Sequence, residues 1–479
     1  MSFPWRSVPQ STHGKLTQPP CHPECNKAYP ACASAAGTGE PSRRGALRET
    51  RPEPFASAAL RSGQACRRIL RVVQNDNTDE SYRKVYQRQM SRFSQWAMIC
   101  TLAIWIAFWQ LTRCPFSWAA EPATMVTDGT RSANDWQEAQ AGYQFSFPRD
   151  HAAHPPYRVE WWYYTGNVET PEGRRFGYQL TFFRTGVTLT PTTPSRWAVR
   201  DLYMTHFAIS DLDNKKFYFF ELLNRAGVHW AGAETNQYHV WNEGWEARLE
   251  GDVHVLSARE NSCTIALRLT PDKLPVIHGE NGLSQKGASA GNASQYYSFT
   301  RLRTNGTIAV DGQTFTVSGL SWMDHEFGTS FLEKDQVGWD WFSLQLQDGR
   351  ELMLFQLRRA DGSIDPHSSG TLVEANGTTT HLSMSEFSLV PEQYWHSPES
   401  GARYPTVWLL TLPGYDLRLR VSAAVPNQEL RTEASTGVTY WEGSVVVTEK
   451  SGGYNIHGRG YLEMTGYAGK SMGPILEGY

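Results

Sequence analysis

The sequence predicts an all-β protein. Beyond residue 130 helical periodicity is nearly absent, and short alternating or aromatic-rich runs recur between Gly, Asn and Asp residues, which is the pattern of a β-sandwich or β-barrel. The stretch from residue 140 to residue 479 is too long for one small barrel. We therefore predict two consecutive antiparallel β-barrels, spanning residues 135–328 and 329–479, with the domain boundary just after an acidic motif.

Individual strands are predicted where apolar and β-branched runs are bounded by turn-forming residues. These runs are 175–184, 216–223, 264–269, 408–411, 417–421 and 444–448. Two-residue hairpin loops, whose central residues need positive φ, are predicted at Asn305-Gly306, Asp311-Gly312, Asp348-Gly349 and Asn376-Gly377. The Gly-, Ser- and Asn-rich stretch 278–295 predicts a long surface loop that could cover the mouth of a cavity.

The Asp348-Gly349 turn allows a register to be predicted. A two-residue loop there places Trp341 opposite Gln356 and Trp339 near Arg358, on a mixed aromatic and amide face. The opposite face is mostly apolar and includes Asp340. The mixed face suits the lining of a pocket, and an amphipathic outer sheet face is the alternative.

Charge is distributed unevenly along the 479 residues. Up to residue 90 the chain has 14 Lys and Arg against 7 Asp and Glu, and beyond it 31 against 41. The acidic body argues against a protein that binds the phosphates of nucleic acid. No glycine-rich phosphate loop connects a strand to a helix, and the histidines lack defensible ligand spacing. We predict no cofactor and no bound metal.

The N-terminal part predicts export. Met90 and Arg92 precede an apolar run at 96–111, and small residues at Ser117 and Ala119 fit a cleavage site. Residues 90–120 are therefore predicted to be a signal peptide or membrane anchor, which would deliver the protein to the periplasm or beyond or associate it with a membrane. Residues 1–89 are predicted to be disordered or an over-extended gene model. After residue 120 only Cys263 remains, so no internal disulfide is expected.

Three ionisable side chains stand together in the motif 319–328. Asp324, His325 and Glu326 lie between Trp322 and Phe327. Burial among rings raises a carboxyl pKa, which lets the group deliver a proton. We predict these three residues as catalytic. The alternative is a hydrogen-bonded polar cluster that closes a barrel.

A second motif, 154–168, contains four consecutive aromatic residues. On a strand, Trp161 and Tyr163 share one face while Trp162 and Tyr164 share the other, with Glu160 on the Trp162 face. One aromatic pair must line an interior. The remaining predicted ligand-binding positions are His206, Trp322, Trp339, Trp341, Gln356, Tyr440 and Trp441. Core packing explains many of these rings equally well, and a strand histidine such as His206 is more often structural than catalytic.

Six ordered motifs carry a family resemblance. They are Glu-Trp-Trp-Tyr-Tyr-Thr-Gly from 160, Thr-His-Phe-Ala from 205, Ser-Trp-Met-Asp-His-Glu-Phe-Gly from 321, Gly-Trp-Asp-Trp-Phe from 338, Tyr-Trp-Glu-Gly from 440 and Gly-Tyr-Leu-Glu-Met-Thr-Gly-Tyr from 460. Together they resemble the secreted lipocalin-like family related to carotenoid 1,2-hydratase (hydroxyneurosporene synthase), over about residues 135–479. The resemblance implies two lipocalin-like barrels and a small apolar ligand of polyene or isoprenoid type. Among the family's catalytic positions, only those in the Trp-Met-Asp-His-Glu motif can be carried over.

Three functions remain open from the sequence. In a hydro-lyase, a protonated carboxyl adds a proton to a C=C and water quenches the carbocation; Asp324 is the expected acid and Glu326 the second choice. If the segment is extended, both carboxyls share a face with Trp322 and His325 points away, whereas a turn would bring all three together. The alternatives are a non-catalytic carrier of a lipophilic molecule, and a secreted hydrolase such as a retaining glycosidase using Asp324 and Glu326.

Overall fold

The computed structural model describes residues 136–469, except 192, 194, 196, 330–331, 449 and 452–453. The predicted segments 1–89 and 90–120 lie outside the described residues. Within the described part, no helix is both long and apolar enough to cross a membrane. The regular helices there are three short 3-10 turns, η1 (Arg149–His151), η2 (Met384–Glu386) and η3 (Pro413–Tyr415). The predicted all-β class is confirmed.

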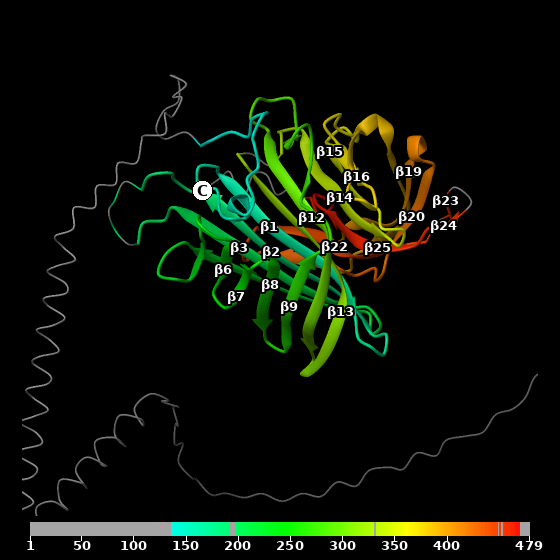
Figure 1. Cartoon of the computed structure of the whole chain (residues 1–479), viewed down its shortest axis with the longest axis horizontal. Coiled ribbons are helices and arrows are strands. Elements are labelled where there is room, and N and C mark those ends of the chain that lie inside the picture. The colour runs from blue at the N-terminus through cyan, green and yellow to red at the C-terminus, as the bar shows by residue number, and fades with distance from the viewer. Residues whose placement is uncertain are drawn as a thin grey trace, which may run out of the picture. The chain divides into compact units, whose positions relative to one another are not determined.

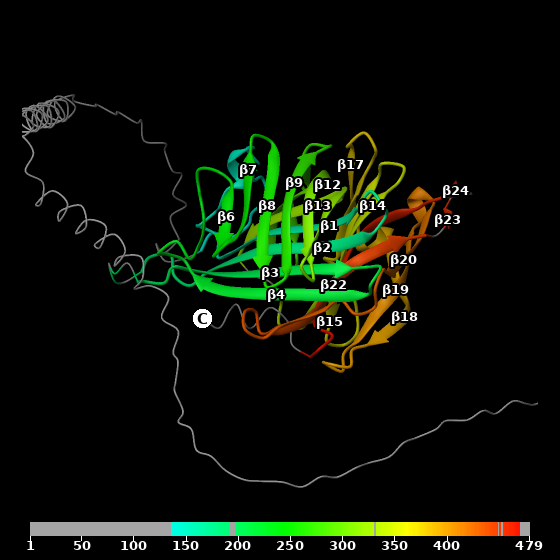
Figure 2. The same cartoon turned by 90° about the horizontal axis from the view of Figure 1, so that it is seen from below.

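The first sheet has 13 antiparallel strands and curls into a nearly closed barrel (Figures 1 and 2). Its path runs β4-β3-β2-β1-β13-β12-β9-β8-β7-β6-β5, and β10 and β11 pair with β12. Bridges between Ala226, Gly227 and Ala231 bring the edge strands β4 and β5 together. The strands are β1 (Val159–Glu169), β2 (Arg175–Gly186), β3 (Asp201–Asp211), β4 (Lys216–Arg225), β5 (Ala231–Ala233), β6 (His239–Asn242), β7 (Trp245–Glu250), β8 (Val253–Glu260), β9 (Cys263–Pro271), β10 (Val276–Ile277), β11 (Leu283–Gln285), β12 (Ala293–Val310) and β13 (Gln313–Gly328).

The second sheet has ten antiparallel strands and forms a half-barrel beside the first (Figure 1). Its path runs β17-β16-β15-β14-β25-β22-β20-β19-β18, with β21 paired to β22. The strands are β14 (Gln336–Leu346), β15 (Glu351–Arg359), β16 (Ser369–Val373), β17 (Thr379–Ser383), β18 (Ser388–His396), β19 (Arg403–Leu412), β20 (Leu417–Ala423), β21 (Glu429–Thr432), β22 (Val438–Val447) and β25 (Gly458–Met464). A separate pair, β23 (Lys450–Ser451) and β24 (Tyr454–Asn455), lies off this sheet. All six predicted strand runs fall within these elements except for one residue at the end of the last run.

The two barrels pack as one compact unit. Each sheet has its own apolar core on its concave side. A third cluster joins the two sheets and is rich in aromatic residues; its buried members are Tyr163, Tyr296, Trp322, Trp341, Met353, Phe355, Leu357 and Tyr461. The four aromatic residues of β1 explain this arrangement, because alternation sends Trp162 and Tyr164 into the first core and Tyr163 into the joint between the barrels.

The hairpin between β14 and β15 differs from the prediction by one residue. Leu344 pairs with Leu352 and Trp341 with Phe355. The loop has three residues, 347–349, because the Leu346 N–H bonds to the Arg350 carbonyl and Gly349 takes a φ of 89°, which is the geometry of a turn followed by a left-handed glycine. A shift of one residue exchanges the faces of the partner strand, so Gln356 does not share the face of Trp339 and Trp341.

The other predicted turns have mixed outcomes. Asp311-Gly312 is a two-residue loop with both φ angles positive, as expected. Asn376-Gly377 lies in a longer loop, where the Glu374 N–H bonds to the Thr378 carbonyl. Asn305-Gly306 is not a turn, because it lies inside β12. A Cβ at Gly306 would sit 2.1 Å from the Ala266 carbonyl oxygen, so this glycine permits close approach of β9 and β12 rather than a reversal of the chain.

Only part of the stretch 278–295 is the surface excursion that its composition predicts, because residues 280–281 and 288–290 are exposed while both ends of the stretch are buried. Residues Leu283–Gln285 pair with β12. His278 is fully buried, and its ring nitrogens lie 2.7 Å from the Ser298 hydroxyl and 2.8 Å from the Thr371 hydroxyl of the second sheet. This segment therefore ties the barrels together, and it delivers Lys286 to the cavity described next.

Candidate active site

A cavity lies between the two barrels rather than inside either of them. The empty space among its lining residues is about 840 Å³, which includes the open solvent at its mouth. The first barrel contributes residues of β1, β2, β12 and β13, and the second contributes residues of β14, β15 and β25. Its lining is mostly apolar and consists of Val159, Trp161, Tyr163, Phe183, Lys286, Ser294, Asp324, Glu326, Gly328, Leu332, Trp339, Trp341, Phe355, Leu357 and Glu463.

Strand β13 separates the three ionisable residues of its motif. The segment is extended, so Asp324 and Glu326 line the cavity while His325 points into the first barrel. Trp322 shares the face of the two carboxyls and belongs to the aromatic joint. The sequence left open whether residues 324–326 form an extended strand or a turn, and in the structure they are extended.

Asp324 is held firmly in the cavity wall. Its Oδ2 accepts a hydrogen bond from the Tyr296 hydroxyl at 2.6 Å, and its Oδ1 accepts from the Trp322 indole N–H at 2.5 Å and from the Ser298 hydroxyl. Burial raises the pKa of Asp324 to about 7, although the three donors act in the opposite direction. A carboxyl of this kind exchanges its proton near neutral pH, as a general acid must.

Glu326 has a different environment from Asp324. Its Oε2 lies 3.1 Å from the ammonium of Lys286 and accepts a hydrogen bond from the Ser294 hydroxyl. The Lys286 ammonium also lies 4.5 Å from the ring centre of Phe355 and 5.2 Å from that of Tyr296. The cation and the hydroxyl both stabilise a carboxylate at Glu326.

Glu463 brings a third carboxyl from the second barrel. It stands on β25, paired with Trp341 of β14, and its Oε2 accepts a hydrogen bond from the Trp339 indole N–H at 3.0 Å. Burial raises the pKa of Glu463 to about 7, and the charges of Asp324 and Glu326 act in the same direction. The cavity thus has two carboxyls, contributed by different barrels, that both titrate near neutrality.

Behind this wall lies Glu442, the cross-strand neighbour of Glu463. It is buried, and among the described residues neither carboxyl oxygen has a hydrogen-bond partner; the nearby hydroxyl of Tyr163 has none either. Burial, followed by the charge of Glu463, raises the pKa of Glu442 well above its ordinary value. A carboxyl so placed is expected to stay protonated at neutral pH.

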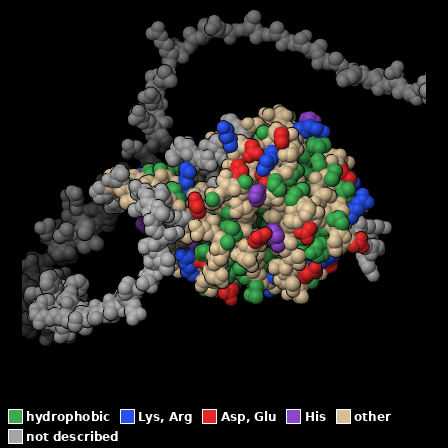
Figure 3. Space-filling view, turned by 90° about the horizontal axis from the view of Figure 1, so that it is seen from above, with side chains coloured by type: hydrophobic (Ala, Val, Ile, Leu, Met, Phe, Trp, Pro, Cys, Tyr) green, Lys and Arg blue, Asp and Glu red, His purple; other side chains and the backbone are tan. Residues whose placement is uncertain are grey.

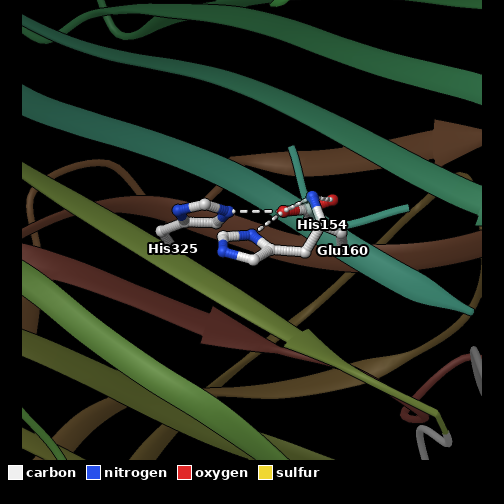
Figure 4. Close-up of side chains that lie close together, drawn as sticks. All are labelled: His154, Glu160 and His325. Carbon is white, nitrogen blue, oxygen red and sulfur yellow. Dashed lines mark hydrogen bonds and ion pairs between the residues drawn. The ribbon is translucent and has the colours of Figure 1, made fainter. Parts of the chain in front are cut away.

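His325 belongs to a buried network in the first barrel (Figure 4). Its Nε2 lies 2.9 Å from Glu160 Oε1, and His154 Nδ1 lies 2.8 Å from the same oxygen. The Arg184 guanidinium donates to Glu160 Oε2 at 3.0 Å and to Asp201 at 3.0 Å. Arg184 and the two histidines outweigh burial and hold the pKa of Glu160 well below its usual range.

The ligand atoms of His154, Glu160 and His325 lie close enough together to hold a metal ion. The other nitrogens of both rings are engaged, His154 Nε2 with Asp150 at 3.2 Å and His325 Nδ1 with the Tyr297 hydroxyl at 3.0 Å. The Arg184 guanidinium lies 3.0 Å from Glu160 Oε2 and already supplies a positive charge to this carboxylate. These contacts describe a satisfied hydrogen-bond network.

Residues 138–467 match the sequence profile of the AttH-like family. The chain belongs to the AttH-like family. The crystal structure of an AttH-like protein from Nitrosomonas europaea is 34% identical, with a TM-score of 0.63 over 69% of this chain and 99% of that one. This membership confirms the lipocalin-like, hydratase-related family that the six motifs predicted.

One relative of this AttH-like protein and one solved structure of the same fold are named for the reactions they catalyse. Dehydratase asqC of Emericella nidulans is 23% identical over 53% of this chain and 75% of its own length. Kievitone hydratase from Nectria haematococca is 14% identical and has the same fold, with a TM-score of 0.55 over 69% of this chain and 95% of that one.

Several predicted site residues of this AttH-like protein lie away from the cavity. Trp162 and Trp441 are buried in the two barrel cores. His206 Nδ1 lies 2.7 Å from the Tyr440 hydroxyl, so this pair joins the barrels, and burial lowers the pKa of His206 to about 3. Gln356 donates to Asp340 on the far face of β15. Among the predicted ligand-binding residues, Trp161, Tyr163, Trp339 and Trp341 line the cavity.

The cavity of this AttH-like protein also contains residues that were not predicted from the sequence. Lys286 lies in a stretch that was predicted to be a surface loop, and Glu463 belongs to the motif that begins at residue 460 but was not predicted as a site residue. The useful signal was the alternation of Tyr461 and Glu463 on one strand face, because both point toward the first barrel.

On the outer face shown in Figure 3, acidic and basic side chains are intermingled, without a continuous field of either sign.

Proposed function

We propose that this AttH-like protein is a hydro-lyase that adds water to, or eliminates water from, a mostly apolar substrate in the cavity between the barrels. The observation that carries the proposal is Asp324, a buried carboxyl with a pKa of about 7 in an aromatic-walled cavity. The dehydratase relative and the hydratase of the same fold support this reaction class.

In the hydration direction, protonated Asp324 gives its proton to one carbon of the substrate C=C. The faces of Trp161, Trp339 and Trp341 stabilise the positive charge that develops on the other carbon. Water bonds to that carbon and loses a proton to the carboxylate of Glu463. Proton exchange between Asp324 and Glu463 through solvent then restores the starting state, and dehydration runs through the same steps in reverse.

Oxygen exchange with solvent tests this proposal without requiring the substrate to be known. The full-length protein is incubated in ¹⁸O-water with a panel of isoprenoid alkenes and tertiary alcohols, each with and without a ketone group, and products are followed by mass spectrometry. We expect ¹⁸O to enter at least one alcohol, and Asp324→Asn to slow this by about 100-fold or more. The absence of label with wild-type protein across the panel, together with a lipid that co-purifies unchanged, would favour the non-catalytic carrier instead.

We also propose that residues 90–120 direct export. The support is the short basic start, the apolar run and the small residues before position 120. Expression with a C-terminal tag, followed by fractionation and N-terminal sequencing of the exported product, tests this. A product that stays in the cytoplasm with residues 90–120 intact would contradict it.

A further inference from the structure

Lys286 is the one cation among the described residues that line the cavity. Its side chain is largely buried, and its ammonium meets Glu326 at 3.1 Å. Its other close neighbours are the rings of Tyr296 and Phe355, which attract a cation but accept no conventional hydrogen bond. Among the described residues, a group with three N–H donors therefore has one carboxylate as its acceptor.

The position of Lys286 is fixed by its backbone. Its N–H donates to the Asn292 carbonyl at 2.8 Å, and its carbonyl accepts from the Gln336 amide at 2.8 Å. Gln336 begins β14 of the second barrel and is itself anchored to Asp365 at 2.9 Å. The segment that carries Lys286 is thus tied to both barrels, and the ammonium is held at the cavity wall.

A bound hydrocarbon would leave the remaining N–H donors of Lys286 enclosed without acceptors, which is unfavourable. An anionic ligand would face the carboxyls of Asp324, Glu326 and Glu463 in the same cavity. A neutral acceptor such as a carbonyl oxygen satisfies the ammonium without adding negative charge.

We propose that the substrate is an oxygenated apolar molecule whose neutral carbonyl oxygen accepts a hydrogen bond from the Lys286 ammonium. This inference rests on the proposed use of the cavity as the substrate site. Lys286 is then a positioning residue, because it fixes one end of the substrate while the apolar part lies among Trp161, Trp339 and Trp341. Lys286 would make the cavity bind such a substrate more tightly than a pure hydrocarbon, and the carboxyls in the cavity would disfavour a carboxylate.

Three naphthalenes of the same shape test the proposal: 2-acetylnaphthalene, 2-ethylnaphthalene and 2-naphthoate. Binding to the full-length protein is measured by equilibrium dialysis, so no turnover is needed and a failure of the hydro-lyase proposal is seen separately. We expect the ketone to bind about tenfold more tightly than the hydrocarbon and more tightly than the carboxylate. Lys286→Met should abolish the preference for the ketone over the hydrocarbon.

Two further variants complete the test. Lys216→Met removes an exposed lysine that pairs with Asp311 outside the cavity, and it should leave all three affinities unchanged. Glu326→Gln releases Lys286 from its carboxylate, so the ketone should bind more tightly, and this holds even if Lys286→Met folds poorly. The proposal would be overturned if wild-type protein bound the ketone and the hydrocarbon equally well, preferred naphthoate, or did not bind the ketone. It would also be overturned if Lys286→Met still preferred the ketone over the hydrocarbon.

Discussion

Asp324 and His325 are adjacent in sequence, yet they point to opposite faces of β13. Asp324 opens on the cavity between the barrels, whereas His325 Nε2 lies 2.9 Å from Glu160 Oε1 inside the first barrel. Burial raises the pKa of Asp324 and lowers that of His325, since it disfavours the charged form of each group. In the proposed function Asp324 performs the chemistry, whereas His325 supports the first barrel.

This division predicts opposite effects of two substitutions. Asp324→Asn should reduce turnover by about 100-fold or more while leaving the fold intact. His325→Ala removes a partner from buried Glu160 and should lower the free energy of unfolding by about 2–3 kcal/mol, with activity per folded molecule largely retained. Urea unfolding and the ¹⁸O assay measure the two effects. Activity that is lost in His325→Ala but kept in Asp324→Asn would reverse the assignment.

The pH dependence of turnover follows from two carboxyls with pKa values of about 7. Hydration requires protonated Asp324 and ionised Glu463, so the rate should fall both below and above neutral pH. The acid and alkaline limbs of this pH–rate profile describe the titration of the two carboxyls as a coupled pair. In Glu463→Gln the acid limb should disappear and the maximal rate should drop, while the alkaline limb remains. A profile that keeps its acid limb in this variant would show that another group accepts the proton.

Glu442 predicts a pH dependence of stability. Its pKa is raised in the folded state, so folded protein binds the extra proton and ionisation opposes folding. The contribution of Glu442 to stability should therefore be fully present below about pH 4.5, the ordinary pKa of a glutamate. This contribution should decline as the pH rises above that value. Glu442→Gln removes this loss. We expect its melting temperature to exceed that of wild type at pH 8 and the difference to shrink at pH 4; a variant less stable at both pH values would mean that the carboxyl makes a favourable contact.

Alternation along single strands was readable from the sequence. It placed Trp161 with Tyr163, and Asp324 with Glu326, because a strand exposes every second residue to one face. The sequence did not predict positions that depend on pairing between distant segments. An example is Glu463 of β25, which faces the first barrel. The register error at Gln356 has a local cause, since one extra loop residue exchanges the faces of a strand.

Arg184 provides a test of the buried network that supports the site. Its side chain is 1% exposed and contacts Glu160 and Asp201. Arg184→Met leaves Glu160 without its guanidinium and Asp201 with only Arg200, 3.9 Å away, and should cost about 3–5 kcal/mol of unfolding free energy. Arg175 offers a matched control, because its side chain is 43% exposed where it pairs with Asp213, and Arg175→Met should cost no more than about 1 kcal/mol. Urea denaturation of both variants makes the comparison. If the two losses were equal, Glu160 would be stabilised mainly by its histidines, and the positions of His325 and β13 would not depend on the arginine.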